Sequence, residues 1–158
     1  MKTWAEISYQ LGRNDLPWAL DWAICEKQLT DLNEIAQGIE DAWTGPDGPM
    51  NYLRKIDWAH YFSMVGFLHN TVRTSAPTEP ITVYRGSTRS RRFRWSWTED
   101  REQAEWFTTR LTNAGIEAHL WTAEIPAGKA MARFDAARSE AEWVFDPVGT
   151  RVRLATQT

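Results

Sequence analysis

The hydrophobic pattern of this 158-residue chain changes its period near residue 76. Before that point, apolar residues recur every three or four positions, which is typical of amphipathic helices. After it, short β-branched and aromatic runs alternate with polar residues, which is typical of strands. We therefore predict an α+β protein. We expect a single domain over residues 1–158, with a helical part over 1–76 and a β-rich part over 77–158.

Two long helices are expected in the first part. One begins near Pro17, and its apolar stripe would be Trp18, Trp22, Cys25, Leu29, Leu32 and Ile35. After a break at 45–49, the second would cover about residues 51–73, with the stripe Leu53, Ile56, His60, Met64 and Phe67. On this interpretation Cys25 is a small buried hydrophobe and His60 is a core histidine.

Composition narrows the function classes. Hydrophobic residues make up 42% and charged residues 25% of the chain, as in ordinary globular proteins. The net charge of -3 argues against a general nucleic-acid binder, although a local basic patch stays compatible with it. Ten Trp suit an aromatic-walled cleft as well as a core. One cysteine and three scattered histidines make no zinc site, so no metal is expected.

The start of the chain turns polar at once, and no apolar run approaches the length that spans a bilayer. We therefore expect a cytoplasmic protein without a membrane partner.

The first chemical motif is Tyr84-Arg85-Gly86, at the end of an expected strand that begins at Ile81. An arginine held by a sheet can grip a phosphate or a carboxylate with two donors. A solvated arginine beside a turn glycine explains the same residues.

The second motif is Ser96-Trp97-Thr98, on an expected strand that leads into a helix. Thr98 fits the N-cap of that helix. Ser96 lies between two tryptophans, where a small hydroxyl shapes a pocket and orients a neighbouring side chain, or simply faces water.

The third motif is Glu140-Ala141-Glu142. If the segment is extended, a separation of two residues puts both carboxylates on the same face. Paired carboxylates suit the cleavage of glycosidic bonds, where one stabilises a cationic sugar and the other handles the proton or the nucleophile. A solvated acid pair is the alternative.

In this order the three motifs resemble the arginine–serine–glutamate class of ADP-ribosyltransferases, in its compact bacterial and phage toxin-like type. The resemblance covers roughly residues 81–147. It implies an ADP-ribosyltransferase-like fold, in which N-terminal helices pack on a mostly antiparallel, split β-sheet. It also implies that NAD is the substrate, cleaved at its nicotinamide glycosidic bond, with no metal.

The resemblance also implies roles. Glu142 would be the catalytic acid that stabilises the oxocarbenium-like state, and Ser96 would orient it. Arg85 would hold the NAD phosphates, and Glu140 would position or deprotonate the acceptor. The cofactor-binding set would be Tyr84, Arg85, Gly86, Ser96, Trp97, Thr98 and Glu142.

Two departures from the family pattern concern the rim of the pocket. Only ten residues separate Arg85 from Ser96, and Trp97 replaces a small central residue of the motif. The aromatic that walls the nicotinamide site would be Trp95, Trp97 or Phe134.

The acceptor is open between classes. In the resembled family Glu-x-Glu is associated with a protein arginine, which is the first expectation. A cluster of arginines interleaved with Phe93 instead fits a nucleic-acid backbone with stacked bases, a grip on the adenosine phosphates of NAD, or a solvated loop. Its members are Arg89, Arg91, Arg92 and Arg94, and the first three are the expected acceptor-binding residues beside Glu140.

Two further alternatives are an NAD glycohydrolase, in which water is the acceptor, and a non-catalytic binding module. The complete set of Arg85, Ser96 and Glu142 counts against the module. Small enzymes of the resembled kind are often toxic to a cell, which makes an antitoxin or immunity protein a plausible partner.

Overall fold

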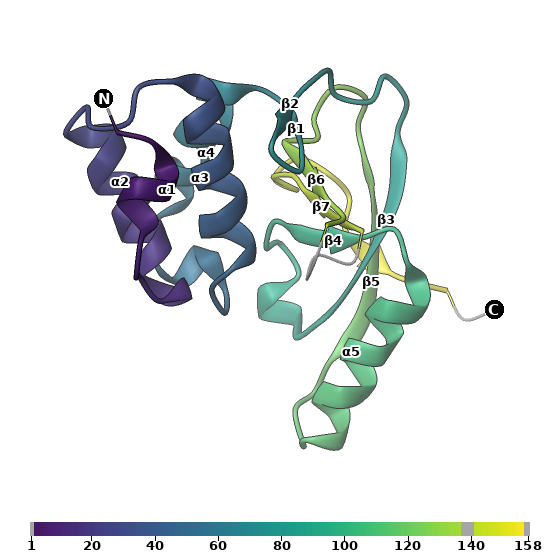
Figure 1. Ribbon diagram of the computed structural model, residues 1–158. Coiled ribbons are helices and arrows are strands. Elements are labelled where there is room, and N and C mark those ends of the chain that lie inside the picture. Colours follow the sequence, from purple (N-terminus) through teal and green to yellow (C-terminus); the bar gives the residue numbers. More distant parts are fainter. Residues whose placement is uncertain (1, 137–140, 157–158) are drawn as a thin grey trace. The chain divides into compact units, whose positions relative to one another are not determined.

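The computed structural model describes residues 2–136 and 141–156. It divides the chain into two compact units, one ending at Ser75 and the other beginning at Ala76 (Figure 1). Helices and a mostly antiparallel sheet are both present, so the prediction of an α+β protein is confirmed.

The first unit is mainly helical. Its elements are α1 (Trp4–Ser8), the 3-10 turn η1 (Arg13–Asp15), α2 (Leu16–Cys25), α3 (Leu32–Thr44), the turn η2 (Pro49–Asn51), α4 (Lys55–Val65) and the short antiparallel strands β1 (Leu68–His69) and β2 (Val72–Arg73). Asp31 caps α3, because its carboxylate accepts hydrogen bonds from the backbone N–H groups of Asn33 (2.8 Å) and Glu34 (3.2 Å).

Aromatic rings fill the core of the helical unit. Trp43 of α3 meets Trp58 of α4 edge to face, with ring centroids 5.0 Å apart, and meets Phe62 at 5.5 Å. All three rings are buried. The indole Nε1 of Trp58 donates to the carbonyl of Pro49 (3.2 Å), so its polar end is satisfied. Several tryptophans of the chain are therefore core residues.

The predicted apolar stripe of the first helix is wrong. α2 ends at Cys25, and α3 begins separately at Leu32. Trp18 is 57% exposed and Cys25 is also exposed. The buried side chains of α2 are those of Leu16, Pro17, Leu20 and Ala23. Apolar residues occur on both faces of α2, and packing buries the aliphatic face instead of the one with the tryptophans.

The second stripe is wrong for the same reason. α4 ends at Val65, where Gly66 has a φ of +75° and breaks the helix. The buried residues of α4 are Trp58, Tyr61, Phe62 and Val65. Ile56 and His60 are exposed, so His60 is not a core histidine.

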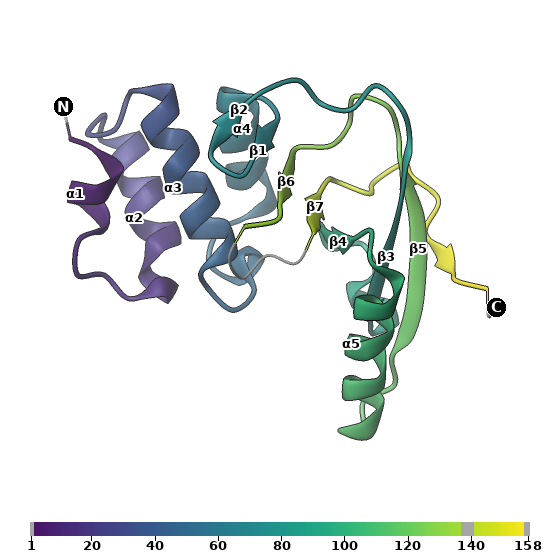
Figure 2. The same cartoon turned by 45° about the vertical axis from the view of Figure 1, so that its right-hand side comes forward.

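The second unit is a sheet with one long helix. Its elements are β3 (Ile81–Ser87), the turn η3 (Arg89–Arg91), β4 (Ser96–Thr98), α5 (Arg101–Asn113), β5 (His119–Ile125), β6 (Ala132–Phe134), β7 (Glu142–Val144) and β8 (Arg153–Leu154). The strand order within this unit is β6-β7-β4-β3-β5-β8, and the pairs are antiparallel. In both ribbon views α5 runs beside β3 and β5 (Figures 1 and 2).

Candidate active site

Three neighbouring strands bring the three motifs together. Tyr84 of β3 is paired with Thr98 of β4, and Thr98 is paired with Glu142 of β7. The motifs are therefore adjacent in the sheet, although 55 residues of sequence fall between Gly86 and Glu142. The antiparallel register accounts for this, because it aligns the end of β3 with β4 and β4 with the start of β7.

The two faces of β4 have different characters. Trp97 and its register partner Trp143 of β7 are both buried. Side chains alternate along a strand, so Ser96, Thr98 and Glu142 lie together on the opposite face. β4 and β7 thus each bury a tryptophan on one face of the sheet and present polar side chains on the other face.

Ser96 and Glu142 make direct contact. The Ser96 hydroxyl donates a hydrogen bond to Glu142 Oε2, with 2.7 Å between the oxygens. This bond crosses from β4 to β7 on the shared face and fixes the rotamer of the glutamate. The expected orienting role of Ser96 therefore has a geometric basis, because a carboxylate held in this way is preorganised.

Arg85 links β3 to two carbonyl groups beyond its own strand. Its Nη1 donates to the carbonyl of Ser96 (2.7 Å), and its Nε donates to the carbonyl of Arg91 (3.0 Å). Among the described residues, no acceptor is recorded for Nη2. The guanidinium thus braces the turn η3 and β4 and keeps donors for an anion.

The charge of Arg85 is poorly compensated. Burial and, to a smaller extent, the positive charges of Arg94 and Arg91 lower the pKa of its guanidinium to about 10, against the opposing effect of Glu142. The group is still protonated at neutral pH. The lowered pKa means that keeping Arg85 positively charged costs folding free energy below about pH 10. An anion bound beside Arg85 would offset that cost and be stabilising.

Gly86 has a steric role that the sequence did not reveal. A Cβ placed on Gly86 would lie 2.4 Å from the carbonyl oxygen of Ala104 and 2.5 Å from Thr108 Oγ1. Both atoms belong to α5, so only glycine lets this helix approach β3 so closely. The expected role of Gly86 in binding the cofactor stays a prediction.

The helix α5 begins two residues later than the sequence indicated. Its N-cap is Asp100, whose carboxylate accepts from the backbone N–H of Gln103 (3.3 Å). Thr98 is therefore not the cap, and its hydroxyl instead accepts from the backbone N–H of Asp100 (3.0 Å). A threonine two residues before the cap forms a local turn that leaves its side chain on the polar face of β4.

A cavity of about 350 Å³ lies over this polar face. Its lining residues are Tyr84, Arg85, Gly86, Ser96, Trp97, Thr98, Gln103, Ala104, Phe107 and Glu142. All seven expected cofactor-binding residues are among them. Three others come from α5, and the sequence reasoning missed them as site residues. The sequence signal for two of them is the spacing of Ala104 and Phe107, which places both on one face of the helix.

Of the three aromatic residues expected to wall the cavity, Trp97 lines it. Trp95 and Phe134 are buried and do not line it. Tyr84 and Phe107 do, and Phe107 is 44% exposed. The guanidinium of Arg101, at the start of α5, lies 5.6 Å from the centre of the Tyr84 ring, a cation–π contact that favours this position of the ring.

Glu140 lies outside the described residues. Ala141 is described and has a φ of +52°, so the chain is left-handed, not extended, directly before Glu142. The condition for placing both carboxylates on one face, an extended segment, is therefore not met at Ala141.

The expected acceptor-binding arginines form a compact group on the turn after β3. Arg89 and Arg92 lie 5.3 and 5.7 Å from the ring of Trp121, and Arg92 also covers Phe93 at 4.5 Å. Arg91 is exposed, and its carbonyl is the one that Arg85 binds. The group therefore adjoins the cavity through Arg85.

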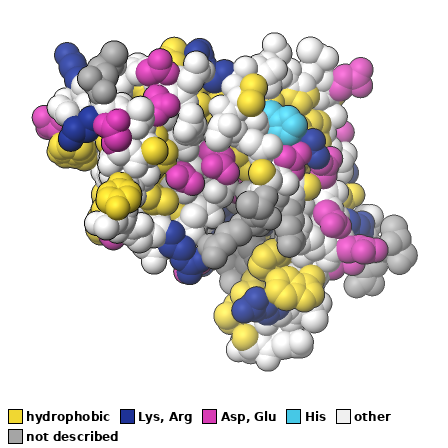
Figure 3. All heavy atoms as spheres, in the orientation of Figure 1, with side chains coloured by type: hydrophobic (Ala, Val, Ile, Leu, Met, Phe, Trp, Pro, Cys, Tyr) yellow, Lys and Arg dark blue, Asp and Glu magenta, His cyan; other side chains and the backbone are white. Residues whose placement is uncertain are grey.

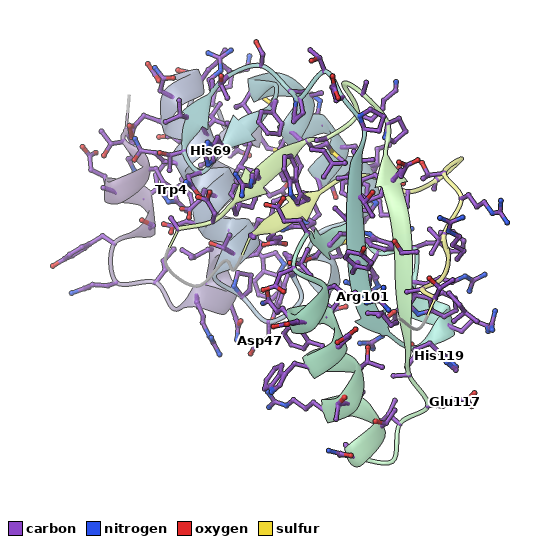
Figure 4. All side chains as sticks on the ribbon, turned by 90° about the vertical axis from the view of Figure 1, so that its right-hand side faces the viewer. Trp4, Asp47, His69, Arg101, Glu117 and His119 are labelled. Atoms are coloured by element: carbon purple, nitrogen blue, oxygen red, sulfur yellow. The ribbon has the colours of Figure 1, made fainter. Side chains whose placement is uncertain are left out.

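The histidines do not contribute to the cavity lining within the described part of the chain. His119 lies at the start of β5, 3.5 Å from a carboxylate oxygen of Glu117, and stacks edge to face on Trp121 (Figure 4). Across residues 2–136 and 141–156, no cluster of acidic, histidine and cysteine side chains suited to a metal ion was found. In the same ranges, no helix combines the length and the apolarity needed to cross a bilayer.

Comparison of the chain with protein-family models, curated proteins and solved structures found no match. The functional interpretation therefore depends on the geometry of the cavity and on the motif resemblance.

Proposed function

We propose that the chain is an NAD-dependent mono-ADP-ribosyltransferase with the fold of that family. The observation that carries the proposal is the cavity, since all seven residues that the motif resemblance assigns to NAD line it. Motifs of chance origin have no reason to line one cavity. The volume of about 350 Å³ is in the usual range of ligand pockets, about 300–1,000 Å³.

The proposed reaction is a substitution at the anomeric carbon of the nicotinamide ribose. The bond from that carbon to nicotinamide breaks, and its electron pair leaves with nicotinamide and neutralises the pyridinium charge. The acceptor forms the new bond to the same carbon and loses its proton to solvent or to a nearby base. Glu142, fixed by Ser96, supplies the negative charge that a cationic ribosyl centre requires.

The other lining residues fit the rest of the substrate. Arg85 has donors left for a phosphate oxygen, and its lowered pKa indicates a site that lacks negative charge. Phe107 and Tyr84 offer ring surfaces at the cavity on which a planar nicotinamide can stack. These contacts bind and orient NAD, whereas Glu142 acts on the bond that breaks.

The test is nicotinamide release from NAD by the purified protein and by Glu142→Gln. The substitution keeps an oxygen that accepts the Ser96 hydrogen bond and removes the negative charge. We expect the rate to fall about 100- to 1,000-fold, as when one preorganised electrostatic contact is lost. Glu124→Gln is the matched control, because it removes an exposed carboxylate on β5 and should release nicotinamide at the normal rate.

Unchanged release by Glu142→Gln would contradict the proposed site. If the wild-type protein releases no nicotinamide, a non-catalytic binding module replaces the enzyme. If it makes only free ADP-ribose in the presence of macromolecules, it is an NAD glycohydrolase.

A further inference from the structure

We propose that the acceptor of the ADP-ribosyl group is a single-stranded nucleic acid, held by the arginines of η3 and by the exposed rings of α5. This inference rests on the proposed function and names its substrate class. The motif resemblance alone implied a protein arginine. The charges around the cavity favour an anionic acceptor.

The first support is the shortage of negative charge on the arginine turn. Among the described residues, the structure records no ion pair for Arg89, Arg91 or Arg92. Arg89 and Arg92 are steadied against the ring of Trp121 instead, and Arg92 donates from Nη1 to the carbonyl of Arg89 (2.6 Å). A group of cations ordered without carboxylates is suited to phosphate groups.

The second support is the effect of this turn on Arg85. Burial is the main reason that the pKa of Arg85 is lowered, and the charges of Arg94 and Arg91 add to it, so further positive charge in this place is unfavourable. A protein arginine entering the cavity would bring one more guanidinium to the same place. A phosphodiester chain would bring the opposite charge and relieve the repulsion.

The third support is an aromatic pair on the exposed side of α5. Trp106 is 55% and Phe107 is 44% exposed, and their rings meet edge to face at 5.0 Å. Arg110, one turn further, lies 5.3 Å from the ring of Trp106. Figure 3 shows hydrophobic side chains together with a basic one over α5. Phe107 also lines the cavity, so the ring surface is continuous with the site of chemistry.

Together the two groups match what single strands require. Arginines contact the backbone phosphates, and exposed rings stack on unpaired bases with little preference for sequence. In a duplex the bases are stacked on each other and cannot use Trp106. A nucleophilic atom of a base or a sugar hydroxyl would displace nicotinamide, forming its bond to the anomeric carbon and releasing one proton to water.

The experiment supplies labelled NAD to the purified protein with one of three acceptors. They are a mixed-sequence single-stranded oligonucleotide in RNA and DNA forms, the same sequence as a duplex, and an arginine-rich peptide. Nicotinamide release is measured in parallel without any acceptor. We expect label on the single strand, much less on the duplex, and none on the peptide.

The matched variants are two double substitutions that each remove two exposed arginines. Arg89→Gln with Arg91→Gln should lower the oligonucleotide label per nicotinamide released about tenfold, because two phosphate contacts are lost. The slope of log affinity against log salt for a fluorescent single strand should decrease in magnitude by about 1.4. Arg151→Gln with Arg153→Gln, at the edge strand β8 and just before it, should change neither quantity.

Each other result overturns the inference. Label on the peptide but not on the oligonucleotide would leave the proposed enzyme intact and make a protein arginine the acceptor. Equal labelling of duplex and single strand, or full labelling by the Arg89 and Arg91 variant, would exclude the surface described. Absence of nicotinamide release from the wild type would instead contradict the proposed function itself.

Discussion

The helical unit and the β-rich unit each bury some aromatic side chains and expose others, so rings of the same kind serve two purposes. In the helical unit Trp43, Trp58 and Phe62 are buried against one another and fill a core. In the β-rich unit Trp106 and Phe107 stand exposed beside a polar cavity. The comparison teaches that a high tryptophan content identifies neither a core nor a cleft until the exposure of each ring is known.

Charge separates the two units as well. The first 75 residues contain six Lys and Arg against ten Asp and Glu, whereas the remainder contains twelve against eleven. The net charge of -3 is therefore the sum of an acidic helical unit and a nearly balanced β-rich unit. In the β-rich unit, arginines are concentrated on η3. We infer that the chemistry belongs to the second unit, and the following predictions test that division.

The largest expected effect is on stability. Trp58→Ala removes a buried ring and its hydrogen bond to Pro49, and should lower the free energy of unfolding by about 3–5 kcal/mol. Urea denaturation measures this, with Trp58→Phe as the milder control. At a temperature where the variant stays folded, nicotinamide release should be normal. A large loss of that activity would show that the helical unit contributes to the reaction.

The next largest effect should appear both in stability and in the rate of nicotinamide release. Gly86→Ala forces α5 away from β3, because its Cβ would lie 2.4 Å from the Ala104 carbonyl oxygen. We expect a loss of about 1–3 kcal/mol in stability and a fall in nicotinamide release, since α5 carries Phe107 at the cavity. Gly12→Ala in the helical unit is the control, because its Cβ would meet only Asp15 Oδ2 at 3.7 Å. Wild-type behaviour of Gly86→Ala would mean that the close approach of α5 is unimportant.

The smallest effects distinguish the units most sharply. Asp31→Ala and Asp100→Ala each remove a helix N-cap and should each cost about 1 kcal/mol, measured by thermal denaturation. Only Asp100→Ala should also slow nicotinamide release, because α5 borders the cavity and α3 belongs to the other unit. Equal slowing of nicotinamide release by both variants would contradict the proposal that the chemistry belongs to the second unit.

The candidate site was more predictable than the helices for a physical reason. Strands such as β4 bury one face, so the period of two fixed Ser96 and Thr98 opposite Trp97 without ambiguity. α2 and α4 carry apolar residues nearly all round, so periodicity allowed two buried faces, and the structure buries the one not chosen.

What sequence reasoning missed at the site depends on tertiary contacts. The closeness of Gly86 to Ala104 and the exposure of Phe107 exist only after α5 has packed on β3. The brace from Arg85 to the Arg91 carbonyl likewise requires η3 to fold back toward β4. No local pattern in the sequence encodes these distances.

The left-handed backbone of Ala141 has a consequence for how this segment can change over generations. A left-handed conformation costs a residue with a Cβ about 1–2 kcal/mol, and glycine and asparagine tolerate it best. In a library of all substitutions at position 141, glycine and asparagine should therefore be enriched and valine and isoleucine depleted. The backbone conformation, and not the chemistry of the neighbouring glutamates, would then determine which residues are accepted at position 141.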